Sequence, residues 1–178
     1  IANCGVSMAF VPEDRFGMGL APSLDIVDNV MLKSYKDSKG PLVDRDTPKK
    51  VSEQMVKDLS IVTPNVYTPV RRLSGGNVQK VLVGREIHSQ PRLLITAYPV
   101  RGLDINSSHT IYDLLNEQKL KGVAVIYIGE DLDVLMQISD RLLVMNNGKV
   151  TGIVDPRETD KNEVGLMMLG TDKGEISA

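Results

Sequence analysis

The sequence contains little cysteine, few aromatic residues and no large excess of charge of either sign. Its 178 residues include a single cysteine, Cys4, no tryptophan and only 4% aromatic residues. One cysteine excludes an internal disulfide and a cysteine-rich zinc site, and it is typical of proteins from a reducing cytosol. The formal net charge is −2, so the composition does not indicate a nucleic-acid-binding surface or a strongly basic membrane patch.

Long apolar runs are absent as well. The longest strongly apolar run, Val123 to Ile128, has the length of a strand, whereas a helix that crosses a bilayer needs about 20 apolar residues. No signal peptide is visible, and the chain begins with Ile1 rather than Met, so we expect it to be a piece of a longer polypeptide. With 42% apolar and 25% charged residues, the composition is that of a soluble globular domain with a core.

Apolar periodicity predicts strands that alternate with helices, which is typical of an α/β layered domain with a mostly parallel sheet. Buried strands are expected at 8–11, 93–97 and 123–128, a hairpin at 142–145 and 150–154, and helices around 26–31 and over 47–59, 76–89, 105–121, 131–138 and 158–169. Asn147-Gly148 predicts the tight hairpin turn. The residues after Val11, with Gly17 and Gly19, and the polar segment from Ser34 to Asp46 are expected to be loops.

The stretch Leu73 to Lys80 reads L-S-G-G-N-V-Q-K and directly precedes a predicted helix. Ser74 is a suitable N-cap, because its hydroxyl can accept a hydrogen bond from a backbone N–H one turn into the helix. Gly75 and Gly76 allow a ligand to approach the backbone, and the positive end of a helix attracts phosphate. Taken alone, S-G-G favours an ordinary capped helix start over a phosphate site.

The longer pattern is more specific. The L-S-G-G-x-x-Q-K stretch, the apolar strand after it and the P-x-R-G-L-D segment that ends at Asp104 resemble the signature motif, Walker B strand and D-loop of ABC-type ATPases. The V-P-E-D-R segment from Val11 to Arg15 is similar to the Q-loop region of sugar-type ABC importers. The resemblance covers residues 8–169, nearly the whole chain.

This resemblance implies a P-loop NTPase-like (ABC ATPase-like) fold with an inserted helical subdomain. It divides the chain into core segments at 1–21 and 85–158, a helical subdomain with the signature at 22–84, and a C-terminal helix and tail at 159–178. The phosphate-binding motif G-x-x-x-x-G-K-[ST] has no match in the sequence. We therefore expect one partial nucleotide-binding domain without its Walker A part. The missing strand would lie beside 123–128, leaving an apolar edge that invites self-association.

Four positions depart from the family pattern. Glu13 stands where the Q-loop glutamine would be, and Ala97 and Tyr98 replace the Walker B aspartate and glutamate. Glu130 replaces the switch histidine, where an anion would repel a γ-phosphate. Since alanine cannot hold magnesium and a tyrosine with a pKa near ~10 is a poor base, we expect no hydrolysis at this chain's own site. No metal site is expected, and His88 and His109 are interpreted as structural.

ABC domains pair head to tail, so the resemblance assigns the signature to the ATP bound by a partner domain. Ser74, Gly75 and Gly76 would contact its γ-phosphate, and Asn77 and Gln79 complete the predicted nucleotide-binding set. Gln79 is also expected, with Lys80, to stabilise the signature helix and its docking. Asp104 in the D-loop would communicate across the dimer.

The motifs resemble most closely the second, C-terminal and often degenerate domain of fused ATP-binding proteins that import sugars or purine nucleosides. The full protein would then be an ATPase that uses ATP and Mg²⁺ at the cytoplasmic face of the membrane, whereas the isolated chain would bind no cofactor and be inactive. Its partners would be a second nucleotide-binding domain, which we expect in the same polypeptide, the transmembrane permease subunits and, indirectly, an extracytoplasmic solute-binding protein. No nucleic acid is expected.

Two other interpretations stay open. The first is a non-transport ABC ATPase, such as a DNA-repair or ribosome-associated type, which would show nucleic-acid binding. The second is a structural or regulatory half-domain that only docks the permease. The intact S-G-G argues against the second, although glycines are also retained for close packing.

Overall fold

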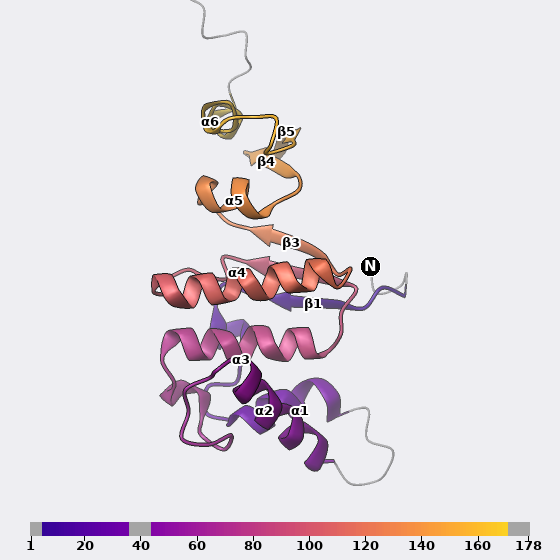
Figure 1. The fold of residues 1–178 in the computed structure, drawn as a ribbon, viewed down its shortest axis with the longest axis vertical. Helices are drawn as coiled ribbons and strands as arrows, with labels where there is room; N and C mark the ends of the chain where they lie inside the picture. The colour runs from indigo at the N-terminus through magenta and orange to yellow at the C-terminus, as the bar shows by residue number, and fades with distance from the viewer. Residues whose placement is uncertain (1–4, 36–43, 171–178) are drawn as a thin grey trace, which may run out of the picture. The chain divides into compact units, whose positions relative to one another are not determined.

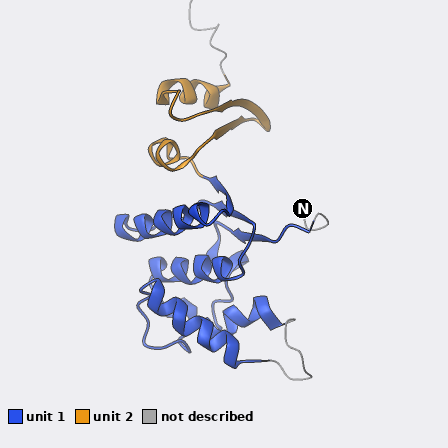
Figure 2. Ribbon diagram, turned by 45° about the vertical axis from the view of Figure 1, so that its right-hand side comes forward, with its two compact units in different colours: residues 1–128 blue, residues 129–178 orange. Residues whose placement is uncertain are grey.

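A computed structural model describes residues 5–35 and 44–170. They belong to two compact units, residues 1–128 and 129–178, which Figure 2 shows in different colours. Most of the predicted loop between Ser34 and Asp46, and the predicted tail after Gly170, lie outside the described residues. None of the described helices has both the length and the apolarity that crossing a bilayer requires.

The first unit is built on a parallel sheet of three strands. They are β1 (Met8–Val11), β2 (Leu93–Ala97) and β3 (Ala124–Ile128), in the order β1-β2-β3. The register aligns Phe10 with Ile95, and Ile95 with Ile126. The predicted parallel sheet is therefore confirmed for this unit, and within the described chain β3 pairs with β2 alone.

Four α-helices complete this unit, and each begins or ends close to its predicted residue (Figure 1). They are α1 (Ile26–Ser34), α2 (Asp46–Asp58), α3 (Gly75–His88) and α4 (Ile105–Leu120). The N-caps of α1, α3 and α4 are Asp25, Ser74 and Asp104, each of which accepts a hydrogen bond from a backbone N–H three residues later. Local capping chemistry thus fixes where these helices start.

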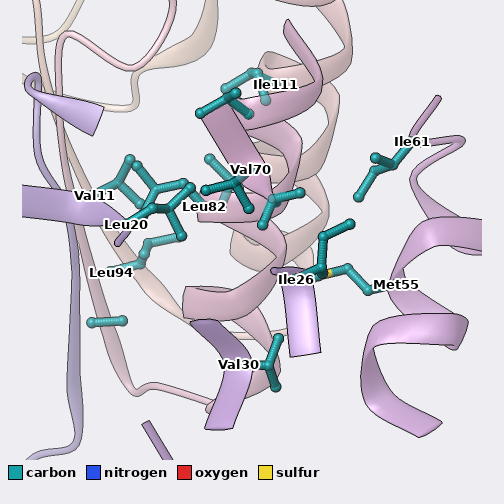
Figure 3. Close-up of a cluster of buried hydrophobic side chains, with 14 of the residues drawn as sticks. Val11, Leu20, Ile26, Val30, Met55, Ile61, Val70, Leu82, Leu94 and Ile111 are labelled. Carbon is teal, nitrogen blue, oxygen red and sulfur yellow. The ribbon is translucent and has the colours of Figure 1, made fainter. Parts of the chain in front are cut away.

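One face of the sheet is buried under α3, which packs on β1, and α4, which packs on β3. The side chains on this face alternate along the strands, for example Ala9 and Val11 on β1 and Leu94 on β2. Figure 3 shows that these residues share one core with side chains of α1 and α2, including Ile26 and Met55. The predicted helical subdomain and the predicted core segments are thus joined by one hydrophobic cluster.

The opposite face of the sheet is exposed, which corrects the prediction of fully buried strands. Met8 and Phe10 on β1 are 49% and 39% exposed, and Ile126 and Ile128 on β3 are 48% and 44% exposed. Periodicity could not reveal this, because a continuous apolar run predicts burial on both sides of a strand. Within the described part of the first unit, helices cover only one face of the sheet.

The segment after β1 also differs from the predicted loop. Arg15–Gly19 forms a single helical turn of the π type, labelled η2. Asp14 caps it, since its Oδ1 atom accepts hydrogen bonds from the backbone N–H groups of Phe16 and Gly17 at 3.1 and 2.8 Å. A second short turn, the 3₁₀ helix η4 (Val70–Arg72), precedes α3.

The second unit consists of α5 (Leu132–Ile138), the antiparallel hairpin of β4 (Leu142–Asn146) and β5 (Lys149–Val154), and α6 (Lys161–Leu169). Asn147 and Gly148 have φ angles of 46° and 76°, so the predicted tight turn is confirmed. Leu142, Val144 and Val164 form its small core.

Candidate functional site

The start of α3 is the most complete part of the predicted site. Ser74 and Gly75 are exposed at its N-terminus. Ser74 Oγ accepts hydrogen bonds from Asn77, at 3.4 Å from the backbone N–H and 2.8 Å from the side-chain amide. Within the described residues, the hydroxyl hydrogen of Ser74 and the N–H groups of Gly75 and Gly76 have no acceptor. Three donors therefore remain available at the positive end of the helix, an arrangement that suits an anionic oxygen.

Asn77 anchors this helix start to the preceding loop. Its Oδ1 atom accepts a hydrogen bond from the Val62 N–H at 2.9 Å, while its Nδ2 atom donates to Ser74. Lys80 donates to the Ser60 carbonyl at 3.4 Å. The side chain of Asn77 is thus already committed to two protein partners, and it holds Ser74 in place.

Gly76 lies against the first turn of α4. A Cβ atom at this position would lie 2.4 Å from Ser107 Oγ, closer than side-chain contacts allow. Ser107 is itself fixed, because its hydroxyl donates to Asp104 Oδ2 at 2.6 Å and its N–H donates to Asp104 Oδ1 at 2.9 Å. These hydrogen bonds, first of all that from the Ser107 side chain, hold the pKa of Asp104 below its usual value. The structure therefore brings two predicted elements, the signature and the D-loop aspartate, into direct proximity.

Gly75 lies against Arg15 of η2. Its Cβ position is 3.3 Å from Arg15 Nη1 and 3.9 Å from a side-chain atom of Leu103. Burial lowers the pKa of the Arg15 guanidinium from its usual value. Arg15 also donates a hydrogen bond to the carbonyl of Arg101. A cationic side chain thus borders the start of α3, and η4 places Arg71 and Arg72 directly before it in the chain.

The degenerate positions at the ends of β1 and β2 form a second cluster. Glu13 is ion-paired with Arg101, and the guanidinium of Arg101 lies 6.0 Å from the centre of the Tyr98 ring. Tyr98 has a φ angle of 48°, which is unusual for a residue with a side chain, and its N–H donates to the Ile128 carbonyl at 2.8 Å. Ala97 is the last residue of β2 and directly precedes Tyr98.

This second cluster does not fit a magnesium ion. Mg²⁺ prefers carboxylate and water oxygens in octahedral geometry. Ala97 offers no oxygen ligand, and the one carboxylate of the cluster, on Glu13, is occupied by Arg101. Among the described residues, no group of three or more His, Cys, Asp or Glu side chains is placed to hold a metal ion. These residues therefore offer no set of ligands that suits Mg²⁺.

Four further residues that the sequence analysis considered lie elsewhere. Gln79 is not at the exposed helix start; its side chain is buried. Glu130 is exposed and belongs to the second unit. His88 is exposed near the end of α3, and His109 contacts the ring of Tyr112 edge-on at 6.2 Å between centroids.

A buried ion cluster at the end of α3 is not among the residues that the sequence predicts to be functional. Arg85 and Glu86 are both buried and paired at 2.7 Å, and Lys33 of α1 reaches Glu86 at 2.9 Å. Arg85 also donates to the Gly19 carbonyl at 2.8 Å, which joins α3 to η2. A cavity of about 460 Å³ lies beside this cluster, between α1, α2 and α3. The only sequence signal was a charged pair inside an apolar helix pattern.

Comparison with known proteins gives matches along nearly the whole chain. It is 37% identical over 169 residues to the guanosine import ATP-binding protein NupO of Bacillus subtilis, a match that covers 93% of this chain and 33% of that protein. It is 38% identical over 159 residues to the galactose/methyl galactoside import ATP-binding protein MglA of Escherichia coli, covering 88% of this chain and 31% of MglA. The chain thus spans about a third of the length of the curated relatives it matches. No family model matches it.

Among solved structures, a dimeric ATP-binding cassette in a post-hydrolysis state with ADP and Pi superimposes with a TM-score of 0.72 and 21% identity. The match covers 86% of this chain and 65% of that one. The predicted similarity to import ATP-binding proteins for sugars and nucleosides is therefore confirmed. The described chain has the α/β fold of an ABC cassette, with its parallel sheet.

Proposed function

We propose that this chain is part of the ATP-binding subunit of an ABC importer for sugars or nucleosides, and that it supplies the signature to an ATP held by a partner domain. The observation that carries the proposal is the start of α3. Ser74 caps α3 and is exposed, and the N–H groups of Gly75 and Gly76 have no acceptor in the described structure. These groups would hold γ-phosphate oxygens in the charge-stabilising manner of an oxyanion site.

In this proposal, the chain's own catalytic positions take no part in hydrolysis. Ala97 and Tyr98 provide neither a metal ligand nor a base, and Glu13 is neutralised by Arg101. The isolated chain would therefore hydrolyse no ATP. When bound, ATP and Mg²⁺ would supply the phosphoryl chemistry at the partner's residues, while this chain binds and orients the phosphate and Asp104 communicates across the dimer.

The proposal also assigns partners. A second nucleotide-binding domain, expected in the same polypeptide, would face the start of α3, and the permease would contact the α1–α2 region at the cytoplasmic side of the membrane. The solute-binding protein would act only through the permease. Two observations support a larger parent protein: the relatives are about three times as long, and one face of the sheet exposes apolar side chains such as Phe10 and Ile126.

The test is the ATPase rate of the full protein that contains this chain, before and after Ser74→Arg. A bulky cation at the helix start would fill the phosphate position, so we expect a loss of at least about 100-fold, since a single anion-stabilising donor is worth about that much. Ser74→Ala removes the cap but leaves the position open and should lose less. Asp113→Arg adds the same cation at an exposed position of α4 and should change little.

An unchanged rate in Ser74→Arg would refute the proposal. The signature would then be a structural remnant, and the domain would serve only as a scaffold for the permease. If instead Asp113→Arg lost as much activity as Ser74→Arg, the effect would come from added charge and not from the helix start.

A further inference from the structure

One buried side chain of α3 takes no part in the contacts described so far. Gln79 is 1% exposed, and neither Oε1 nor Nε2 has a hydrogen-bond partner among the described residues. Such groups are rare in native proteins, because a buried amide without partners loses its hydrogen bonds to water and gains none in return. A methionine of similar volume would fill the space without that cost.

The position of Gln79 on the helix indicates what its amide can reach. Residues three and four places earlier share its face of α3, and these are Gly76 and Gly75. Helical side chains lean toward the N-terminus of the helix, which is the direction in which these two glycines lie. The same surface meets Ser107 beside Gly76 and Leu103 beside Gly75. Gln79 therefore shares a helix face with the contact between α3 and the start of α4.

The start of α4 offers a partner with spare capacity. Ser107 Oγ donates its hydrogen to Asp104, so its lone pairs remain able to accept from an amide N–H. An arrangement of α3 and α4 in which Gln79 Nε2 donates to Ser107 Oγ would satisfy the unpaired amide. A ligand that binds more tightly to the arrangement in which the Gln79 amide is hydrogen-bonded would shift the population toward that arrangement.

We infer that Gln79 is a positioning residue that gains hydrogen bonds to the start of α4 when ATP is held against the start of α3. It thereby couples phosphate binding at Ser74 to the position of Asp104. This inference rests on the proposed function. It differs from a role in nucleotide contact, because the Gln79 side chain is buried.

The test is Gln79→Met, measured in two ways. In the 178-residue chain, the urea midpoint of Gln79→Met should equal or exceed that of the original, because an unpaired amide is removed. In the full protein, kcat for ATP hydrolysis should fall about tenfold, within the usual range of coupling between sites, while KM for ATP changes by less than about twofold. Gln118→Met, at a second buried glutamine near the far end of α4, is the matched control and should leave kcat unchanged.

Two outcomes would overturn the inference. If Gln79→Met keeps full kcat, the amide has no part in the reaction. If stability and kcat fall together, Gln79 is merely structural. Ser74→Arg measured in the same preparation separates the two proposals: when it abolishes activity and Gln79→Met does not, only this inference fails, whereas an active Ser74→Arg overturns both.

Discussion

The close approach of α3 and α4 at Gly76 predicts that even one added methyl group destabilises this chain. In Gly76→Ala the new Cβ would lie 2.4 Å from Ser107 Oγ and 3.1 Å from Ser107 Cβ. Since favourable contacts begin near about 3.5 Å, Ser107 must move by roughly 1 Å. Ser107 cannot move freely, because its hydroxyl and its N–H both donate hydrogen bonds to Asp104. The substitution therefore costs packing and also weakens the cap of α4.

The magnitude follows from two opposing terms. Overpacking a close contact costs about 1–3 kcal/mol. Alanine in a helix is favoured over glycine by at most about 1 kcal/mol. The net expectation for Gly76→Ala is a loss of about 1 kcal/mol. Gly165→Ala in α6 is the control, because nothing lies within 4 Å of its Cβ position; it should gain about 0.5–1 kcal/mol.

Urea unfolding followed by circular dichroism measures both variants. Gly76→Ala and Gly165→Ala should differ by about 2 kcal/mol in the free energy of unfolding and have similar m-values. A Gly76→Ala variant that is as stable as Gly165→Ala would refute the reasoning, because the methyl group would then have met open space. Gly75→Ala is a graded case, since its Cβ would meet the flexible end of Arg15 at 3.3 Å and should cost less.

Two further predictions test other parts of the chain. Asn29 is fully buried and holds the loop before α1, accepting from the Ala21 N–H at 2.8 Å and donating to the Ala21 and Asp25 carbonyls at 3.0 and 2.9 Å. Asn29→Ala leaves the Ala21 N–H unpaired, whereas the Ala21 and Asp25 carbonyls still accept from the backbone N–H groups of Leu24 and residue 29. The substitution should cost about 1–3 kcal/mol in urea unfolding, and an unchanged free energy of unfolding would contradict the network. In the second unit, the side-chain hydrogen bond from Arg157 lowers the pKa of Asp155 to about 2. Because this pKa is depressed on folding, the pair stabilises the folded state above about pH 4 and loses its effect as the pH falls toward 2. Carboxyl-carbon NMR titration should find the depressed value, and Asp155→Asn should remove this part of the pH dependence; a pKa near about 4 would show that the pair does not form.

The features that local chemistry determines could be predicted from the sequence. Ser74 and Asp104 cap their helices as expected, because a cap needs only a short polar side chain and a free N–H nearby. Gly122 follows α4 with a φ angle of 85°, and Asn147-Gly148 forms the hairpin turn. These elements depend on a few neighbouring residues, so the printed order of amino acids is sufficient to locate them.

Features that depend on distant segments could not be predicted. The exposure of Ile126 on β3 depends on what covers the sheet, and an apolar run carries no information about that. The ion cluster of Arg85, Glu86 and Lys33 joins residues that lie 53 positions apart along the chain. Gln79 was placed among the nucleotide contacts because of its motif, whereas the helix period turns its side chain inward.

Although the end of β2 supplies no catalytic carboxylate, the residues around it are connected by a series of contacts. Tyr98 sits at a positive φ angle, a conformation that costs a residue with a side chain of order 1–3 kcal/mol and persists only where surrounding contacts enforce it. The turn that follows Tyr98 places Arg101 against Glu13, while the Arg101 carbonyl accepts from Arg15. Arg15 in turn lies beside Gly75 at the start of α3.

These contacts link the end of β2 to the helix start that we propose binds phosphate. If nothing else depended on the turn at Tyr98, relaxing its strained backbone would stabilise the fold. The strained turn sets the position of Arg101, and through Arg101 it sets that of Arg15. We therefore expect Arg101→Ala to disturb the signature more than the sheet. It should lower the ATPase rate of the full protein while leaving the urea midpoint of this chain nearly unchanged, and the reverse pattern would show that the turn serves stability alone.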